Sequence, residues 1–180
     1  MIYILREYFK YYQKISSLLK NKFAQGVSYV FISSIALGIS GFSINLILGY
    51  YYTPEDLGIF NQCFALIQIV SVLGTFGLVS SNVHFVAQNL DNIKLRDEIQ
   101  SSALIIAVFI SLILSISLYL FGNIKKDLFF NIEVNEAFMN IIFVLPFMVS
   151  NRLNISYLNA IREMKLYSTL QSLRWFFLLF

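Results

Sequence analysis

The sequence predicts an all-α integral membrane protein, a multi-span bundle with about five transmembrane helices of about 20 residues each. Hydrophobic residues make up 58% of the chain, charged residues only 13%, and the mean hydropathy is +0.71. A soluble domain has about 25% charged residues and could not bury this much apolar surface. Formal charges are absent, or nearly so, from four long stretches, which cover residues 23–54, 57–90, 99–124 and 137–161.

The first element, residues 1–22, has the pattern of a basic amphipathic helix. Apolar residues recur at steps of three and four, and Arg6, Lys10 and Lys14 lie four residues apart on another face. Such a helix lies along the cytoplasmic membrane surface, with its aromatic side chains in the interface and its basic side chains on anionic lipid. Docking to a partner protein is the alternative for the same pattern.

The transmembrane bundle is expected to occupy residues 23–180. We place its spans at about residues 27–52, 57–84, 99–123, 137–159 and 167–180, because a helix needs about 20 apolar residues to cross the hydrocarbon core. The last segment falls short of that length and ends in an apolar run without a polar anchor. The sequence therefore predicts an amino-terminal fragment of a larger protein, with a natural short form that ends in a half-span as the alternative.

Basic residues in the loops predict the orientation, because Lys and Arg in short loops stay on the cytoplasmic side. The segment 1–22, the loop with Lys94 and Arg96, and the loop with Arg162 and Lys165 fall on one side of the membrane. The loop on the other side with basic residues is the one after the third span, at 125–126. We therefore expect a multi-pass protein of the plasma (inner) membrane with a cytoplasmic N-terminus.

Polar and small residues form a stripe along each of the first two spans. The stripe of the first span consists of Ser34, Gly38, Gly41, Asn45 and Gly49. The stripe of the second span consists of Asn61, Gln68, Ser71, Thr75 and Asn82, and Gly74 and Gly77 weaken the helix between them. Small residues let helices pack closely in lipid, and carboxamides there need hydrogen-bonding partners. The stripes predict either plain helix packing or a water-accessible groove lined by Asn45 and Gln68.

The fourth span has the most polar stretch. Pro146 removes one backbone hydrogen bond and should bend the helix, and Asn151, Arg152 and Asn154 follow it. An arginine near the centre of a transmembrane helix costs about 2.5–3.5 kcal/mol on insertion scales, so its side chain turns to a cavity, a partner or the headgroups. We expect Arg152 to face a polar cavity, with snorkelling to the inner headgroups as the alternative. A positively charged cavity would attract phosphate.

The predicted spans contain no Asp and no Glu, and the sequence has no catalytic or metal-binding pattern. The carboxylates that bind sodium or relay protons in coupled transporters are thus missing here. Glu55 and Asp56 follow Pro54 and predict a helix start rather than a metal pair. The single cysteine, Cys63, is predicted to be a buried structural thiol. We expect no enzyme activity, no metal and no cofactor.

A family resemblance becomes visible in the order of these motifs. Residues 45–89 include LILGYYYTPEDLGIFNQCFALIQIVSVLGTFGLVSSNVHFVAQN, and residues 158–174 are LNAIREMKLYSTLQSLR. The first segment resembles the first hairpin of the Wzx-like polysaccharide flippases, in the multidrug/oligosaccharidyl-lipid/polysaccharide exporter superfamily. The second segment is similar to their cytoplasmic turn between spans four and five. The shared features of the hairpin are PEDLG between the two spans and LGTFGL within the second.

The resemblance implies the first half of a transporter with about 12–14 helices, which moves undecaprenyl-diphosphate-linked oligosaccharide to the outer leaflet by alternating access. Such transport supplies surface polysaccharides such as the O-antigen of lipopolysaccharide. The implied partners are membrane lipid, the lipid-linked substrate and other membrane proteins of polysaccharide assembly. We expect no nucleic-acid partner.

Position and chemistry select Arg152, Asn151, Asn154, Asn45 and Gln68 as candidate substrate-binding residues, and the resemblance adds His84. His84 stands where the family pattern usually has Arg. The positive charge at this position would therefore depend on pH or be absent. Arg152 is the best candidate for a cationic contact with the diphosphate.

Three other functions would fit parts of the sequence. Another exporter of the same superfamily, acting on drugs or amphipathic cations, would be expected to have carboxylates within the membrane. A membrane glycan polymerase or ligase would have a long external loop with catalytic residues. A non-catalytic scaffold would work with these 180 residues alone.

Overall fold

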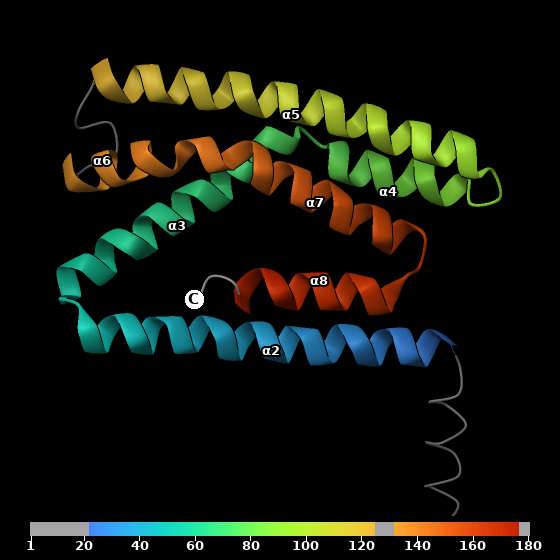
Figure 1. The fold of residues 1–180 in the computed structure, drawn as a ribbon, viewed down its shortest axis with the longest axis horizontal. Coiled ribbons are helices and arrows are strands. Elements are labelled where there is room, and N and C mark those ends of the chain that lie inside the picture. The colour runs from blue at the N-terminus through green and yellow to red at the C-terminus, as the bar shows by residue number, and fades with distance from the viewer. Residues whose placement is uncertain (1–21, 125–131, 177–180) are drawn as a thin grey trace, which may run out of the picture. The chain divides into compact units, whose positions relative to one another are not determined.

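The structure, a computed structural model, describes residues 22–124 and 132–176. These residues form helices and connecting turns, with no strand among them (Figure 1). Among the described residues, four helical segments are long and apolar enough to cross a membrane, namely Ala24–Tyr51, Pro54–Thr75, Ile93–Ile124 and Ile132–Ala160. The predicted fold class, an all-α multi-span membrane protein, is confirmed. The surface helix predicted for residues 1–22 lies outside the described residues, except for its last residue.

The chain divides into two compact units. Unit 1 contains residues 1–41 and 162–180, and unit 2 contains residues 42–161. Helix α2 (Lys22–Tyr51) begins in unit 1 and ends in unit 2. Among the described residues of unit 1, the other helix is α8 (Met164–Phe176), which begins ahead of the fifth span expected at 167–180. The end of that expected span, residues 177–180, lies outside the described residues.

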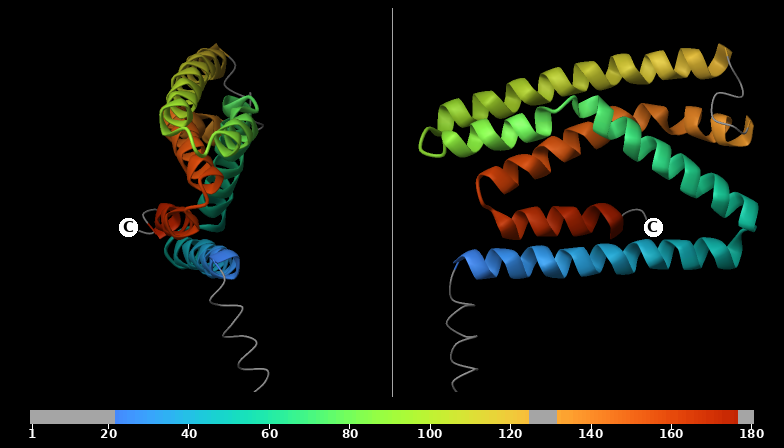
Figure 2. Two further views of the ribbon diagram at one scale, coloured as in Figure 1. Left: turned by 90° about the vertical axis from the view of Figure 1, so that its right-hand side faces the viewer. Right: turned by 180° about the vertical axis from the view of Figure 1, so that it is seen from behind.

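In unit 1, α8 and the first part of α2 lie side by side and run in the same direction (Figures 1 and 2). Gly26 of α2 is buried against the start of α8. A Cβ atom built on Gly26 would lie 3.0 Å from Cγ of Met164. The missing side chain at Gly26 therefore allows the two helices to approach closely, as small residues do between helices in membranes.

A capping box joins α2 to helix α3 (Pro54–Thr75). The Thr53 hydroxyl accepts a hydrogen bond from the backbone N–H of Asp56 at 3.2 Å, and the Asp56 carboxylate accepts one from the backbone N–H of Thr53 at 3.2 Å. Pro54 occupies the first turn, where a missing N–H leaves no hydrogen bond unmade. The interpretation of Glu55 and Asp56 as a helix start is confirmed.

The second predicted span is interrupted in the structure. Helix α3 ends before Phe76, and helix α4 (Leu78–Gln88) follows Gly77. Phe76 and Gly77 adopt left-handed backbone conformations, with φ of 46° and 80°. Glycine takes a positive φ without strain, whereas a residue with a side chain does so at a cost of about 1–2 kcal/mol. The continuous helix expected over 57–84 thus breaks at one of the two glycines expected to weaken it.

Helix α5 (Ile93–Ile124) packs along α4 and along helix α7 (Leu145–Ala160), and it is antiparallel to both (Figure 2). Its buried face is a column of mostly small residues, Gln100, Ala103, Ala107, Ser111, Ser115 and Gly122. Gly74 of α3 is part of the same close packing, because a Cβ atom there would lie 3.1 Å from Cγ2 of Val149 in α7. Small residues allow this approach, since lipid provides no hydrophobic drive for helix association.

The fourth span consists of helix α6 (Ile132–Ile141), the 3₁₀ turn η1 (Ile142–Val144) and α7. Pro146 has no N–H to donate to the carbonyl of Ile142. The buried Ser115 hydroxyl of α5 donates to that carbonyl at 3.2 Å, and the N–H of Leu145 also reaches it within the 3₁₀ turn. The effect of the proline is therefore a local tightening of the helix, and α5 satisfies part of the backbone that the proline frees.

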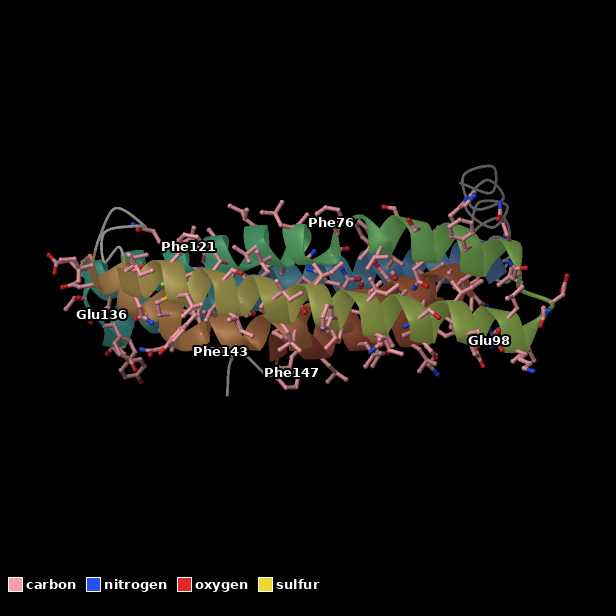
Figure 3. All side chains as sticks on the ribbon, turned by 90° about the horizontal axis from the view of Figure 1, so that it is seen from above. Phe76, Glu98, Phe121, Glu136, Phe143 and Phe147 are labelled. Carbon is pink, nitrogen blue, oxygen red and sulfur yellow. The ribbon has the colours of Figure 1, made fainter. Side chains whose placement is uncertain are left out.

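Unit 2 has an apolar core and an apolar surface. Its core includes Cys63, Ile67, Val70, Phe138, Ile142, Leu145, Val149 and Leu153, and the predicted burial of the Cys63 thiol is confirmed. On the outside, Phe76 is 82% exposed and Phe147 is 77% exposed. Figure 3 shows these side chains, with Phe121 and Phe143, on the flanks of the long helices, whereas Glu98 and Glu136 lie at opposite ends. Apolar flanks between charged ends fit a protein embedded in a bilayer.

Candidate functional site

Two groups of polar side chains lie among the helices of unit 2. The first is the arginine–glutamine pair, Arg152 of α7 and Gln68 of α3. The guanidinium Nη2 of Arg152 donates to the side-chain oxygen of Gln68 at 2.6 Å, and both side chains are half-buried. Within α3, the backbone carbonyl of Gln68 accepts a hydrogen bond from the Ser71 hydroxyl at 2.8 Å. The pair joins two residues that the sequence analysis selected separately, from different spans.

The chemistry of this pair differs from that of an ion pair. The Gln68 amide is neutral, so it accepts a hydrogen bond from the guanidinium without cancelling its charge. A guanidinium has five N–H donors in a planar fork, which matches the oxygens of a phosphate or carboxylate. The pair thus places a positive charge beside a hydrogen-bonding amide within a predicted membrane span. Such a group can bind an anionic or hydroxylated ligand.

The second group, which we call the carboxamide cluster, consists of Asn82 (α4), Gln100 (α5), Asn154 and Ser156 (both α7). Asn82 is 2% exposed. Its side-chain amide donates to the Gln100 oxygen at 2.6 Å and to the Ser156 hydroxyl oxygen at 3.1 Å. Gln100 in turn donates to the Asn154 side-chain oxygen at 3.1 Å. The cluster therefore connects three helices through polar side chains.

Helix α7 positions residues for both groups. Arg152 and Asn154 are two residues apart, so their side chains leave the helix on different sides. Arg152 accordingly meets α3, whereas Asn154 meets α5. The buried residues Val149, Leu153 and Ser156 lie between α7 and its neighbours and fix the rotation of the helix. The packing of α7 thus sets the placement of Arg152, Asn154 and Ser156.

The cluster contains two residues that sequence reasoning missed. Gln100 lies close to the charged residues at the start of α5 and was not singled out, and Ser156 is an ordinary helix serine by sequence. A signal for Gln100 did exist, because it begins the column of α5 that continues through Ala103 and Ala107 at helical spacing. For Ser156 the sequence offers no comparable signal.

The remaining predicted site residues have separate surroundings. Asn45, at the end of α2, accepts a hydrogen bond from Asn61 of α3 at 3.2 Å. His84 is exposed on α4, with its Nε2 atom 3.0 Å from Nε2 of Gln88. Asn151 is half-buried on α7. The structure therefore brings Arg152 together with Gln68, and it links Asn154 to Asn82 through Gln100. Asn45 and His84 form hydrogen bonds with other neighbours.

A surface contact joins the first turns of α5 to the last turn of α7. The Tyr157 hydroxyl donates to Oδ1 of Asp97 at 2.7 Å, and Nε of Arg96 lies 3.3 Å from the same oxygen. The Arg96 guanidinium also stands 5.6 Å from the centre of the Tyr157 ring, within the range of a cation–π contact. An exposed ion pair contributes at most about 1 kcal/mol, so this contact serves mainly to align the two helix ends.

The composition of these groups defines what they can do. They offer amides, hydroxyls and one guanidinium, all suited to hydrogen bonding and charge recognition. Across residues 22–124 and 132–176, no three His, Cys, Asp or Glu side chains lie close enough to hold a metal ion together. Comparison with known proteins identifies no family for this chain. No protein-family model, no curated protein and no solved structure matches the chain.

Proposed function

We propose that this protein is a membrane transporter that moves an undecaprenyl-diphosphate-linked oligosaccharide across the plasma membrane, as Wzx-like flippases do. The single observation that supports this best is the arginine–glutamine pair. Arg152 holds a positive charge in the second half of the span Ile132–Ala160, and Gln68 accepts from it at 2.6 Å. Polar and charged residues within a span are costly and commonly mark the path of a substrate or ion.

The chemistry of the pair suits the proposed substrate. A diphosphate presents anionic oxygens to the guanidinium, and a sugar presents hydroxyls to the glutamine amide. The polyprenyl tail would remain in lipid, beside the apolar flanks of unit 2. The sequence resemblance supports the same substrate, because PEDLG and LGTFGL enclose the span that contains Gln68.

The interrupted span gives further support for a carrier. Discontinuous helices are common at the substrate sites of transporters, where freed backbone groups line a cavity. In this chain the break at Phe76 and Gly77 lies in the span that also provides Gln68. Hydroxyl groups satisfy part of the backbone beside the break, since Thr75 donates to the carbonyl of Val72 at 2.7 Å.

The distribution of acidic residues favours an oligosaccharide over a cationic substrate. In the described parts of the helices, carboxylates lie near helix ends, at Glu55, Asp56, Asp97, Glu98, Glu133 and Glu136. An exporter of cationic drugs needs negative charge within its cavity, whereas the pair described here is positive. We further propose that the N-terminus is cytoplasmic, because this orientation puts most Lys and Arg residues of the loops inside.

The test is Arg152→Gln in the gene that encodes this chain, with Lys94→Gln as a matched control for the loss of one exposed positive charge. A hydrogen bond to a charged group contributes about 1.5–3 kcal/mol, so we expect transport to fall by about tenfold or more. The readouts are surface polysaccharide and lipid-linked oligosaccharide retained in the inner leaflet, at equal protein levels. Normal export by Arg152→Gln would refute the role of the pair, and export of a cationic dye instead would favour drug efflux.

A further inference from the structure

Unit 1 contains a groove of about 400 Å³ between α2 and α8. Its wall on α2 includes Tyr29, Ile32, Ser33, Ala36 and Ser40, and its wall on α8 includes Lys165, Ser168, Thr169, Ser172 and Leu173. The volume lies within the range of small-molecule sites, about 300–1,000 Å³. The groove belongs to neither polar group of unit 2, and the proposed transport function does not use it.

Three of the hydroxyl groups in the groove have hydrogen bonds within their own helices. Ser33 donates to the carbonyl of Val30 at 2.9 Å, and Ser40 donates to that of Ala36 at 2.8 Å. Thr169 donates to the carbonyl of Lys165 at 2.8 Å. A hydroxyl satisfied in this way can lie beside hydrocarbon at little cost. These three positions are therefore compatible with an acyl chain.

Ser168 differs from them. Its side chain is 6% exposed, and its hydroxyl oxygen is buried and has no hydrogen-bond partner. A buried polar group without a partner costs about 1–3 kcal/mol, so a ligand that offered an acceptor to Ser168 would gain that energy. The groove that Ser168 lines is the place from which such a ligand can approach.

Lys165 lies three positions before Ser168, near the start of α8, and is exposed in the same groove. Three residues of helix correspond to about 4.5 Å along the axis. The neighbouring Met164 contacts Gly26, which lies close to the start of the span Ala24–Tyr51. Lys165 is therefore near the level at which the candidate span Ala24–Tyr51 begins, and Ser168 lies further along α8.

We propose that this groove binds the headgroup region of an anionic ester phospholipid, such as phosphatidylglycerol. The Lys165 ammonium binds the phosphate, and the Ser168 hydroxyl donates to an ester carbonyl of the glycerol backbone, which lies deeper in the bilayer than the phosphate. Ile32 and Leu173 contact the acyl chain. An ethanolamine headgroup fits less well, because its ammonium group would lie close to that of Lys165.

The test uses the full-length product of the gene, purified in detergent and titrated with single lipids in native mass spectrometry. The lipids are dioleoyl phosphatidylglycerol, its diether analogue without ester carbonyls, dioleoyl phosphatidylethanolamine and undecaprenyl phosphate. We expect phosphatidylglycerol to bind about fivefold more tightly than phosphatidylethanolamine, from one basic residue. We expect it to bind about fivefold more tightly than the diether, from one hydrogen bond.

Two variants assign these preferences to their residues. Lys165→Gln should remove the preference for the anionic headgroup, and Lys165→Arg should retain it. Ser168→Ala should remove the preference for the ester while it leaves the headgroup preference unchanged. The matched controls are Lys94→Gln and Ser101→Ala, both at exposed positions outside the groove.

Equal binding of phosphatidylglycerol and phosphatidylethanolamine by the wild type would overturn the proposal, and this comparison does not depend on the folding of any variant. Equal or tighter binding of undecaprenyl phosphate that is lost in Lys165→Gln would also overturn it, because that lipid would then occupy the groove without an ester carbonyl. Preferences that Lys165→Gln and Ser168→Ala leave intact would place the lipid elsewhere on the protein. The transport proposal is unaffected by any of these outcomes, since it rests on Arg152.

Discussion

The break between α3 and α4 allows a stability prediction whose size follows from the backbone alone. Gly77 has φ of 80°, and a Cβ atom built on it would meet nothing within 4 Å. Gly77→Ala therefore adds no clash, and its effect comes from the left-handed conformation, at about 1–2 kcal/mol. Alanine also lowers the conformational entropy of the unfolded chain, and this offsets about 0.4–1 kcal/mol of that cost. We predict that Gly77→Ala lowers the free energy of unfolding of unit 2 by about 1 kcal/mol.

Gly58→Ala is the matched control. Gly58 lies within α3, and a Cβ atom there would also meet nothing within 4 Å, but its φ is not positive. Alanine is favoured over glycine in a helix by about 0.5–1 kcal/mol. The same chemical change should therefore stabilise unit 2 at position 58 and destabilise it at position 77, with a difference of about 2 kcal/mol between the variants.

Cys63 provides the assay. It is the single cysteine of the chain, it lies in α3 of unit 2, and it is 5% exposed. Pulsed alkylation in mixed micelles of increasing SDS content would report the fraction of molecules in which unit 2 is open. Gly77→Ala should shift the midpoint to lower SDS, and Gly58→Ala should shift it to higher SDS. If both variants shifted it upward, residue 77 would be helical and the described break would be wrong.

The same labelling assay tests two buried polar contacts. Ser115→Ala removes the hydroxyl that donates to the Ile142 carbonyl, and we expect a loss of about 0.6 kcal/mol, the average for a side-chain hydrogen bond in a membrane protein, with about 1.7 as the upper value. Asn82→Ala removes the two hydrogen bonds to Gln100 and Ser156, and we expect a loss of about 1–2 kcal/mol, because both contacts are buried.

Each of these substitutions has a control at an exposed site. Ser101 is exposed and donates to the carbonyl of Asp97 within its own helix, so Ser101→Ala should change the free energy of unfolding by less than Ser115→Ala. Asn61 is exposed and donates to Asn45 at 3.2 Å, so Asn61→Ala should cost less than Asn82→Ala. A larger loss at either exposed position would show that burial does not govern these contacts.

The fold class was predictable because charge, rather than side-chain detail, defines membrane spans. Stretches without Asp, Glu, Lys or Arg fix where helices can cross, and PEDLG marks a helix start through the known chemistry of caps. The break within the second span was only half predictable. Gly77 marked a weak point, but the identity of Phe76 does not indicate a left-handed residue.

The candidate site was predictable as a set of residues and not as a set of contacts. Gln68 and Arg152 stood out because an amide and a guanidinium are rare in apolar helices, yet their hydrogen bond depends on how α7 rotates against α3. Gln100 did not stand out because it lies close to Asp97 and Glu98 in the sequence. Which partner a buried amide finds depends on helix rotation and register, and a single sequence does not encode these in any local pattern.

The close approach of Gly26 and Met164 has a consequence for biogenesis. The ribosome releases α2 long before α8, and all the helices of unit 2 emerge between them. During that interval the face of α2 that contains Gly26 is exposed to lipid or to an insertion factor. The helices from α3 to α7 can already pack together in the same period. Unit 1 is thus completed after the helices of unit 2 have emerged, and an arrest of translation before residue 164 would leave α2 without α8 beside it.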